Sequence, residues 1–199
     1  MDRVGCMPGV DADKDIEVSE AARKYTYEDY MNSDDDIRFE LIDGVMYMMA
    51  TPSWIHQSII GELYVQLYSF LKDKPCKVFF APLSVCLSIG EGADTVLEPD
   101  LFVLCDKSQL FSNGCNGAPD MVVEILSPSS IRHDRVRKLR VYQNAGVREY
   151  WIVDPDSNSV SVHVMENGRL ITSIYSGDDI VPVHVLEGCE IHLSDVFTE

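Results

Sequence analysis

Basic residues are scarce in this chain, and their scarcity limits the partners that its surface can hold. The 199 residues include 16 Lys and Arg against 33 Asp and Glu, which gives a formal net charge of −17 at pH 7. Proteins that bind duplex nucleic acid usually present a basic surface to its phosphates. The composition therefore disfavours tight, nonspecific duplex binding. Five basic residues nevertheless fall within 132–140. Because salt screens electrostatic fields over roughly 8 Å, this segment can form a locally positive surface on an acidic protein. Alternatively, it is a solvated helix face.

Long apolar runs and metal-binding cysteine spacings are also missing. No apolar run approaches the roughly 18 residues of a transmembrane helix, and residues 1–20 hold no apolar segment of a secretory signal. We therefore expect no membrane partner. The six cysteines form no C-x-x-C pair and no zinc spacing, which disfavours a zinc or redox protein. Cys86 and Cys105 fall in apolar strand patterns as small buried side chains, and we expect reduced thiols and a cytoplasmic location.

What is present predicts one folded domain behind an acidic leader. Residues 1–22 are polar and acidic, contain glycine and proline, and lack periodicity, so they predict a mobile leader. The chain is 46% hydrophobic, which is enough for a core, and residues 23–199 are expected to form a single domain. The order hairpin, helix, strands, helix, strands predicts an α/β fold in which helices pack on a mixed sheet.

Local signals set the boundaries of these elements. Helix N-caps and hairpin turns are predicted at Thr26, Ser53, Ser129 or Ser130, and at the Asp-Gly and Asn-Gly pairs 43–44 and 167–168. Gly146 marks the end of the second major helix. The segment 107–118 contains two glycines and no clear periodicity, and it is expected to be a loop.

Two carboxylates in apolar runs are the most informative feature of the chain. Asp100 opens the run 101–104, and Glu124 lies inside the run 121–126. Short continuous apolar runs predict strands that are covered on both faces. An unpaired charge buried there is too costly to persist. Each carboxylate must therefore be protonated, paired with a cation or bound to a metal.

A lysine completes a chemically meaningful group. Lys138 follows Glu124 by fourteen residues, in a segment with helical spacing. Carboxylates are ligands that magnesium prefers, and a bound metal can polarise a phosphate and acidify water. A nearby ammonium group can position that water or stabilise charge in the transition state. Two acids and a lysine therefore suit hydrolysis of phosphodiester bonds.

The residues around this group resemble the bacterial Uma-two (Uma2) endonuclease family. The resemblance rests on residues 40–44, 98–101, 118–130, 146–147 and 149–155, together with His56, Asp134, Lys138 and Tyr142. It spans about residues 25–165. It implies membership of the PD-(D/E)XK phosphodiesterase superfamily and a restriction-endonuclease-like core with flanking helices and additional β-hairpins.

The resemblance also implies roles for the central residues. Asp100 matches the acid of the PD motif and Glu124 the second acid, and both are implied ligands of Mg or Mn. Leu126 stands where the superfamily's short pattern has a lysine. Lys138, on the following helix, is implied as the replacement that positions water or stabilises the transition state.

Three further residues have weaker implied roles. Glu40 resembles the superfamily's helper acid, which could hold a second metal or bind the lysine; alternatively it pairs with Arg38 or is solvated at a hairpin edge. His56 is either a donor behind the ligands, a phosphate contact or a structural residue. Asp134 precedes Lys138 by four positions, so it either supports the site or forms an ordinary helical ion pair.

The resemblance implies a metal-dependent DNA endonuclease. DNA is then the expected partner, and cutting two strands at one site would favour a homodimer. The net charge of −17 favours an alternative, a catalytically weak or inactive nuclease-fold module that acts in protein binding or assembly.

Overall fold

The structure is a computed structural model that describes residues 23–33, 38–88, 93–127 and 133–198. The predicted leader, residues 1–22, and the predicted helix caps Ser129 and Ser130 lie outside the described residues. The side chains of residues 133–135 are also outside the description, and these include Asp134.

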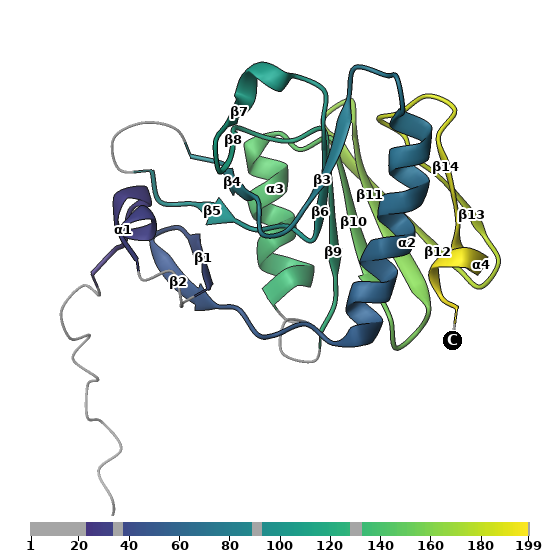
Figure 1. Cartoon of the computed structure of the whole chain (residues 1–199), viewed down its shortest axis with the longest axis horizontal. Coiled ribbons are helices and arrows are strands. Elements are labelled where there is room, and N and C mark those ends of the chain that lie inside the picture. The colour runs from purple at the N-terminus through teal and green to yellow at the C-terminus, as the bar shows by residue number, and fades with distance from the viewer. Residues whose placement is uncertain (1–22, 34–37, 89–92, 128–132, 199) are drawn as a thin grey trace, which may run out of the picture.

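The described chain forms two large mixed sheets and a small one (Figure 1). In spatial order, sheet A contains β2 (Val45–Met48), β1 (Phe39–Ile42), β5 (Val96–Leu97), β4 (Ser84–Cys86), β8 (Gly114–Asn116) and β7 (Leu110–Phe111). Sheet B contains β12 (Arg169–Ser176), β11 (Ser159–Glu166), β10 (Glu149–Asp154), β9 (Met121–Ile125), β6 (Leu101–Leu104) and β3 (Lys77–Phe80). The third sheet pairs β13 (Ile180–Pro182) with β14 (Glu190–His192). The predicted class, helices packed on a mixed sheet, is confirmed.

Sheet B separates two hydrophobic cores because alternate side chains of a strand point to opposite faces. In β9, Met121, Val123 and Ile125 contribute to one core, whereas Val122 contributes to the other. Strands β6 and β9 are buried at every position, as their continuous apolar runs predict. Glu124 lies on the same face as Val122, where a carboxylate meets the second core.

Helix α2 (Trp54–Leu71) covers the first face of sheet B. Its buried residues recur every four positions: Ile59, Leu63, Leu67 and Leu71. Ser53 caps it as predicted, because the Ser53 hydroxyl accepts a hydrogen bond from the backbone N–H of His56 at 3.2 Å. The C-terminal hairpin β13–β14 and helix α4 (Leu193–Val196) pack beside α2. No helix in the described ranges is long and apolar enough to cross a membrane.

Helix α3 (Leu139–Ala145) lies between the second face of sheet B and sheet A. It continues a π-helical segment, η2 (His133–Lys138), and its Tyr142 is fully buried. Gly146 ends the helix as predicted, in the left-handed conformation with φ of 95°, which glycine adopts without a steric penalty.

The short elements near the N-terminus follow their local signals. Thr26 and Asp29 form a capping box at the start of helix α1 (Tyr27–Met31). The Asp-Gly turn at 43–44 joins β1 to β2, and the Asn-Gly turn at 167–168 joins β11 to β12. All four turn residues have positive φ, as tight two-residue hairpins require. Both predicted hairpins are confirmed.

The expectation of a loop over 107–118 is wrong. This segment contains a short 3-10 helix, η1 (Lys107–Gln109), and the strands β7 and β8, which complete the edge of sheet A. Gly114 does not interrupt a strand here; it permits one. A Cβ at this position would overlap the carbonyl oxygen of Ser84 on the neighbouring strand β4. Close approach of two backbones therefore requires glycine.

The expectation of free thiols is wrong for one pair of cysteines. Cys76 and Cys105 form a disulfide across a separation of 29 residues. They flank the antiparallel pair β3–β6, in which Lys77 lies opposite Leu104. Only this register makes them neighbours, so their spacing in the sequence carried no signal. Cys86 is a buried free thiol, as predicted.

The close approach at Gly114 makes a sharp prediction. We expect Gly114→Ala to lower the free energy of unfolding by about 1–3 kcal/mol, because backbone atoms must move to admit the methyl group. Gly61, inside α2, has open space where an alanine methyl group would lie, with nothing within 4 Å, so Gly61→Ala should raise stability by about 0.5–1 kcal/mol. Urea unfolding of both variants measures this. Equal effects would show that strand packing at Gly114 is loose.

Glu149 makes stability depend on pH. This carboxylate, on β10, is fully buried and accepts hydrogen bonds from the Trp151 indole at 2.7 Å and the Val185 N–H at 2.8 Å. Burial raises its pKa above the usual value of 4.5, and the hydrogen bonds oppose this only in part. At a pH just above 4.5, the folded protein therefore binds more protons than the unfolded chain does. Stability from this group is therefore lost as pH rises.

We expect Glu149→Gln to remove this dependence. The free energy of unfolding of the wild type, relative to the variant, should fall as the pH is raised from about 4 towards 7. Urea titrations across this range measure the difference, with Glu166→Gln at the end of β11 as a control that shows no such trend. A difference that stays constant with pH would contradict the assignment.

Candidate functional site

A cavity of about 860 Å³ lies between the hairpin β1–β2, the start of α2 and the ends of β6 and β9. Its lining includes five residues predicted from the sequence as site residues: Glu40, His56, Asp100, Glu124 and Lys138. These residues come from five separate parts of the chain. The fold therefore brings them to one place.

The pairing of β6 with β9 places Asp100 beside Glu124. In this antiparallel register Leu101 lies opposite Val123, so one further step puts Asp100 opposite Glu124. Asp100 is fixed by its own hydrogen bonds: its Oδ2 accepts from the Ile125 N–H at 2.7 Å and lies 3.2 Å from His56 Nε2. The two acids thus line one cavity at the end of sheet B.

Lys138 joins the two sheets at the centre of the site. Its ammonium nitrogen lies 2.8 Å from Glu40 Oε1 on β1 and 2.9 Å from Glu124 Oε1 on β9. All three residues are 4% exposed. A charge-assisted hydrogen bond in such a setting is short and strong, and a buried carboxylate needs such a partner. Of the alternatives for Glu40, the structure shows binding to the lysine and not pairing with Arg38.

Glu98 supports Glu40 from the next strand. The backbone N–H of Glu98 donates to Glu40 Oε1 at 3.1 Å. The Glu98 carboxylate in turn accepts from the Tyr30 hydroxyl at 2.9 Å and from Arg38 at 2.6 Å. Burial and the charge of Glu98 both raise the pKa of Tyr30, so this phenol remains a donor. A chain of hydrogen bonds therefore runs from α1 to the lysine.

Tyr142 is a site residue that the sequence did not reveal as one. Its hydroxyl donates to Glu124 Oε1 at 2.7 Å. Burial, followed by the charge of Glu124, raises its pKa well above the usual value, so it stays a neutral donor. It lies four residues after Lys138, which is one helical turn. That spacing was a usable signal, but an aromatic residue in an apolar helix more often predicts core.

The charges of the group suit a divalent cation. The carboxylates of Glu40, Asp100 and Glu124 and the ammonium of Lys138 sum to a net charge of two negative units. Among the described residues, no three His, Cys, Asp or Glu side chains gather closely enough to form a metal cage. Magnesium does not need one, because it commonly binds through one or two carboxylates and completes its octahedron with water and substrate phosphate. Asp100 and Glu124 fit this donor set.

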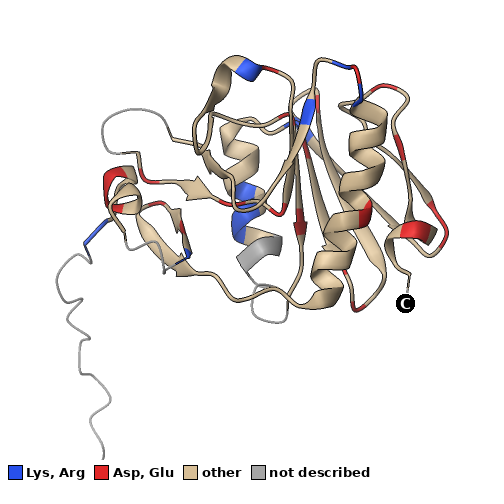
Figure 2. Cartoon of the chain, in the orientation of Figure 1, with Lys and Arg blue, Asp and Glu red and all other residues tan. Residues whose placement is uncertain are grey.

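The lining of the cavity is acidic. Among the described lining residues there are six Asp or Glu and two Lys or Arg, Arg38 and Lys138. Both of these cations are bonded to carboxylates. Figure 2 shows acidic residues spread over many elements, with basic ones fewer. Phosphate groups therefore find little positive charge from the described lining residues.

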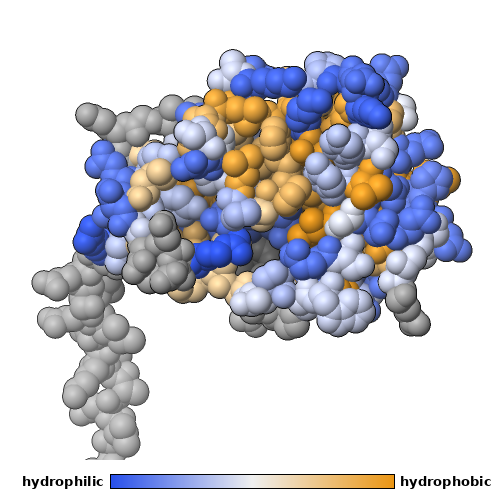
Figure 3. Space-filling view, viewed as in Figure 1, coloured by the Kyte–Doolittle hydropathy of each residue, from blue (hydrophilic) through white to orange (hydrophobic). Residues whose placement is uncertain are grey.

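Three large apolar side chains lie exposed in the lining of the cavity. Met48, Ile55 and Phe80 line the cavity and are 69%, 44% and 51% exposed. Figure 3 shows apolar residues gathered in the middle of the face that carries α2. Large exposed apolar side chains around an acidic centre are typical of a binding site and not of a solvated surface.

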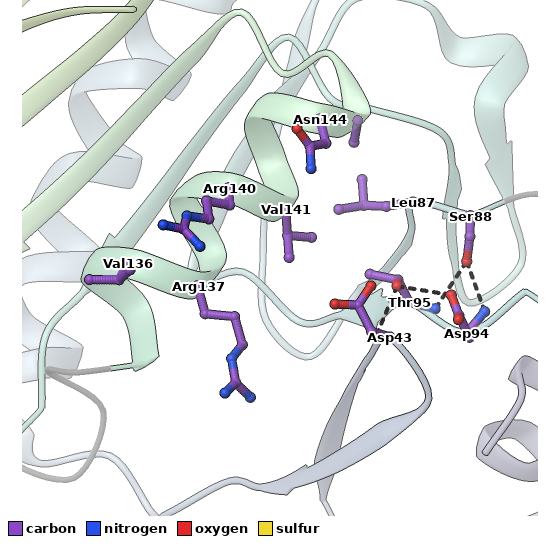
Figure 4. A pocket seen from close by; sticks show the side chains of 11 residues that line it. Asp43, Leu87, Ser88, Asp94, Thr95, Val136, Arg137, Arg140, Val141 and Asn144 are labelled. Atoms are coloured by element: carbon purple, nitrogen blue, oxygen red, sulfur yellow. Dashed lines mark hydrogen bonds between the residues drawn. The ribbon is translucent and has the colours of Figure 1, made fainter. Parts of the chain in front are cut away.

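The described basic residues of the segment 132–140 divide between two hollows. Lys138 points into the site, whereas Arg137 and Arg140 line a second hollow of about 800 Å³ on the other side of the helix. Figure 4 shows Asp43 and Asp94 across this hollow, with Thr95 and Ser88 hydrogen-bonded at its base. The Arg137 guanidinium lies 4.6 Å from the centre of the Tyr47 ring. Of the described basic residues in this segment, Lys138 is therefore buried in the site, whereas Arg137 and Arg140 are exposed.

Comparisons with known proteins agree with this picture. The family model Uma2, described as "Putative restriction endonuclease", matches residues 25–194, beyond the span expected from the sequence motifs. A protein of Synechocystis sp., named "Uncharacterized protein slr1290", is 27% identical over 160 residues, which cover 78% of this chain and 83% of that protein.

A solved structure shows the same fold. The crystal structure of "a putative nuclease belonging to DUF820" from Anabaena variabilis superposes with a TM-score of 0.71 at 22% identity. The match covers 86% of this chain and 97% of that chain. This likeness extends over most of both chains, so the arrangement of elements is shared.

The lysine at the centre of the site makes a prediction about stability. Lys138→Met leaves Glu40 and Glu124 buried without their ammonium, and we expect it to lower the free energy of unfolding by about 3–5 kcal/mol. Lys72→Met, at the exposed end of α2, should change it by less than about 0.5 kcal/mol. Denaturant unfolding at neutral pH compares them. If Lys138→Met were as stable as the control, the ion pairs would be unimportant to the fold.

Proposed function

Because the chain belongs to the Uma2 family, we propose that it is a metal-dependent endonuclease that hydrolyses phosphodiester bonds in DNA. The observation that carries the proposal is that Asp100 and Glu124 line one cavity at the end of sheet B, with Lys138 2.9 Å from Glu124. Two acids and one lysine at a cavity wall suit phosphodiester hydrolysis better than other reactions, because they offer metal ligands and a fixed cation without a nucleophilic side chain.

Asp100 and Glu124 are the proposed ligands of Mg or Mn. Such an ion supplies Lewis-acid polarisation of the scissile phosphate and lowers the pKa of a bound water. The protein residues prepare its place. Ile125 and His56 hold the Asp100 carboxylate through Oδ2, and Tyr142 and Lys138 hold the Glu124 carboxylate through Oε1. Fixed ligands lower the cost of reorganisation on binding.

Lys138 is the proposed cation of the reaction. Its ammonium lies beside Glu124, where it would stabilise negative charge that develops on phosphate oxygens or orient the attacking water. Glu40 positions Lys138 from the opposite side, at 2.8 Å. A side chain held between two acids keeps its geometry, so Glu40 acts through the lysine. His56 acts in the same way through Asp100, and support of the site by Asp134 stays a prediction.

Metal binding and cleavage test the proposal together. Isothermal titration of the full chain with Mn²⁺ should show binding, and incubation with Mg²⁺ or Mn²⁺ should cleave DNA supplied as plasmid, linear duplex and single strand. Glu124→Gln and Asp100→Asn remove ligand charge without loss of volume. We expect each to weaken Mn²⁺ binding at least tenfold and to reduce the cleavage rate by about 100-fold or more.

Glu166→Gln, an equivalent change at the far end of β11, is the matched control and should bind and cleave as the wild type does. Circular dichroism of each variant confirms that the fold is retained. A wild type that binds no Mn²⁺ and cleaves none of the three DNA forms would contradict the proposal. It would favour the alternative of a nuclease-fold module without activity.

A further inference from the structure

A row of side chains leads away from the catalytic cavity along α2. His56, Ile60, Tyr64 and Tyr68 recur at four-residue intervals, so they form one ridge on the helix surface. His56 and Ile60 line the cavity. The ridge is about 18 Å long at 1.5 Å per residue. It therefore connects the proposed active site with the far end of the helix.

Two aromatic rings of this ridge are in contact with each other, and one of them also contacts a ring of strand β3. Phe80, which ends the edge strand β3 and lines the cavity, meets Tyr64 edge-on with ring centres 5.1 Å apart. Tyr64 is stacked with Tyr68 at 5.6 Å. We call Phe80, Tyr64 and Tyr68 the aromatic row. Its three rings begin in the cavity and continue outward without interruption.

The aromatic row is not explained by the core. The buried positions of α2 are a separate stripe, one residue away from the ridge at each turn. Phe80 is 51% and Tyr68 53% exposed, so each ring keeps about half its surface in water. Both flank a half-buried Tyr64 that packs against the core. Rigid aromatic rings that remain exposed beside a cavity are typical of ligand contact.

Electrostatics favours a ligand that binds through its bases. The described cavity lining holds six acids and two Lys or Arg that are already bonded to carboxylates. Duplex DNA carries one charge per roughly 1.7 Å and is held mainly through its phosphates. Its bases are stacked on each other and cannot reach the rings. Unpaired bases present free faces, and stacking on aromatic side chains needs no positive charge.

We propose that the aromatic row binds unpaired bases of single-stranded DNA and directs that strand into the catalytic cavity. The inference rests on the proposed function, whose substrate class it names. Phe80 stacks a base next to the scissile phosphate, and Tyr68 stacks a base further along the strand. The exposed Lys72, one helical turn beyond Tyr68, is placed to contact a phosphate where the row ends.

Fluorescence anisotropy with a 5′-labelled oligothymidine of about 12 nucleotides tests this in the presence of Ca²⁺, a hard cation that takes oxygen ligands. We expect the wild type to bind the single strand more tightly than the matching duplex. Tyr68→Ala and Phe80→Ala should each raise the single-strand Kd about fivefold or more, as loss of a stacked base does. Ile174→Ala, 71% exposed on β12 at the opposite edge of sheet B from β3, should leave the Kd unchanged.

Two further variants separate stacking from simple apolar contact. Tyr68→Trp keeps an aromatic face and should bind as the wild type does, whereas Tyr68→Leu keeps apolar area and should bind as weakly as Tyr68→Ala. A Tyr68→Leu variant that binds the oligonucleotide with wild-type affinity would overturn the proposal, because apolar contact without stacking would then account for binding. Tighter binding of duplex, or single-strand binding that is insensitive to Tyr68 and Phe80, would also overturn it.

The outcome is distinguishable from that of the cleavage experiment. If the protein cleaves duplex DNA at the same rate with and without the Tyr68 ring, the nuclease proposal stands and the aromatic row is not a substrate track. If the single strand binds through the row and no form of DNA is cleaved with either metal, the row stands and the nuclease proposal fails.

Discussion

The site depends on the ion pairs that the ammonium group of Lys138 forms with Glu40 and Glu124. The ammonium nitrogen lies within 2.9 Å of carboxylate oxygens on both large sheets, Glu40 on β1 and Glu124 on β9. Two buried carboxylates without a cation would cost more than the local packing could offset. The lysine therefore makes the approach of sheet A to sheet B possible at this point. Because Lys138 directly precedes α3, its ion pairs also fix the start of this helix relative to both sheets.

The pleat of sheet B explains why polar and apolar environments lie so close together. Odd-numbered residues of β9 face α2 and form a dry core, whereas Glu124 faces α3 and meets Lys138 and Tyr142. A shift of one residue in the pairing would turn Glu124 into the apolar core and Val123 towards the lysine. The free energy that both changes would cost fixes the pairing register of the strand. The same geometry that protects the core thus also fixes the acids.

The arrangement of the site shows how part of the negative charge of the chain is balanced. Charges at the site are neutralised locally, by Lys138 and Arg38, and the remaining negative charge suits a divalent cation. A nucleic acid strand that meets such a surface gains little from long-range attraction. Short-range contacts have to replace it, and the exposed rings of Phe80 and Tyr68 offer them. Affinity from stacking is also less sensitive to salt than affinity from phosphate contacts.

Local signals in the sequence determined the elements and many of the residues of the candidate site. Ser53, Asp43-Gly44 and Gly146 set their caps and turns through backbone preferences that need no distant partner. Asp100 and Glu124 were identifiable because charge in an apolar run requires a partner. Lys138 was identifiable from its place after Glu124 in a segment with helical spacing and from the family resemblance. The structure shows where these side chains meet; their roles in metal binding and catalysis remain proposals.

Contacts between distant segments were decided only by the tertiary structure. The disulfide between Cys76 and Cys105, the strands within 107–118 and the bond from Tyr142 to Glu124 all depend on which strands pair and in which register. So does the aromatic row, since Phe80 meets Tyr64 only when β3 packs beside α2. Caps and turns are set by energies within a few residues of chain. These contacts are set by the packing of two sheets around two helices, which no local pattern encodes.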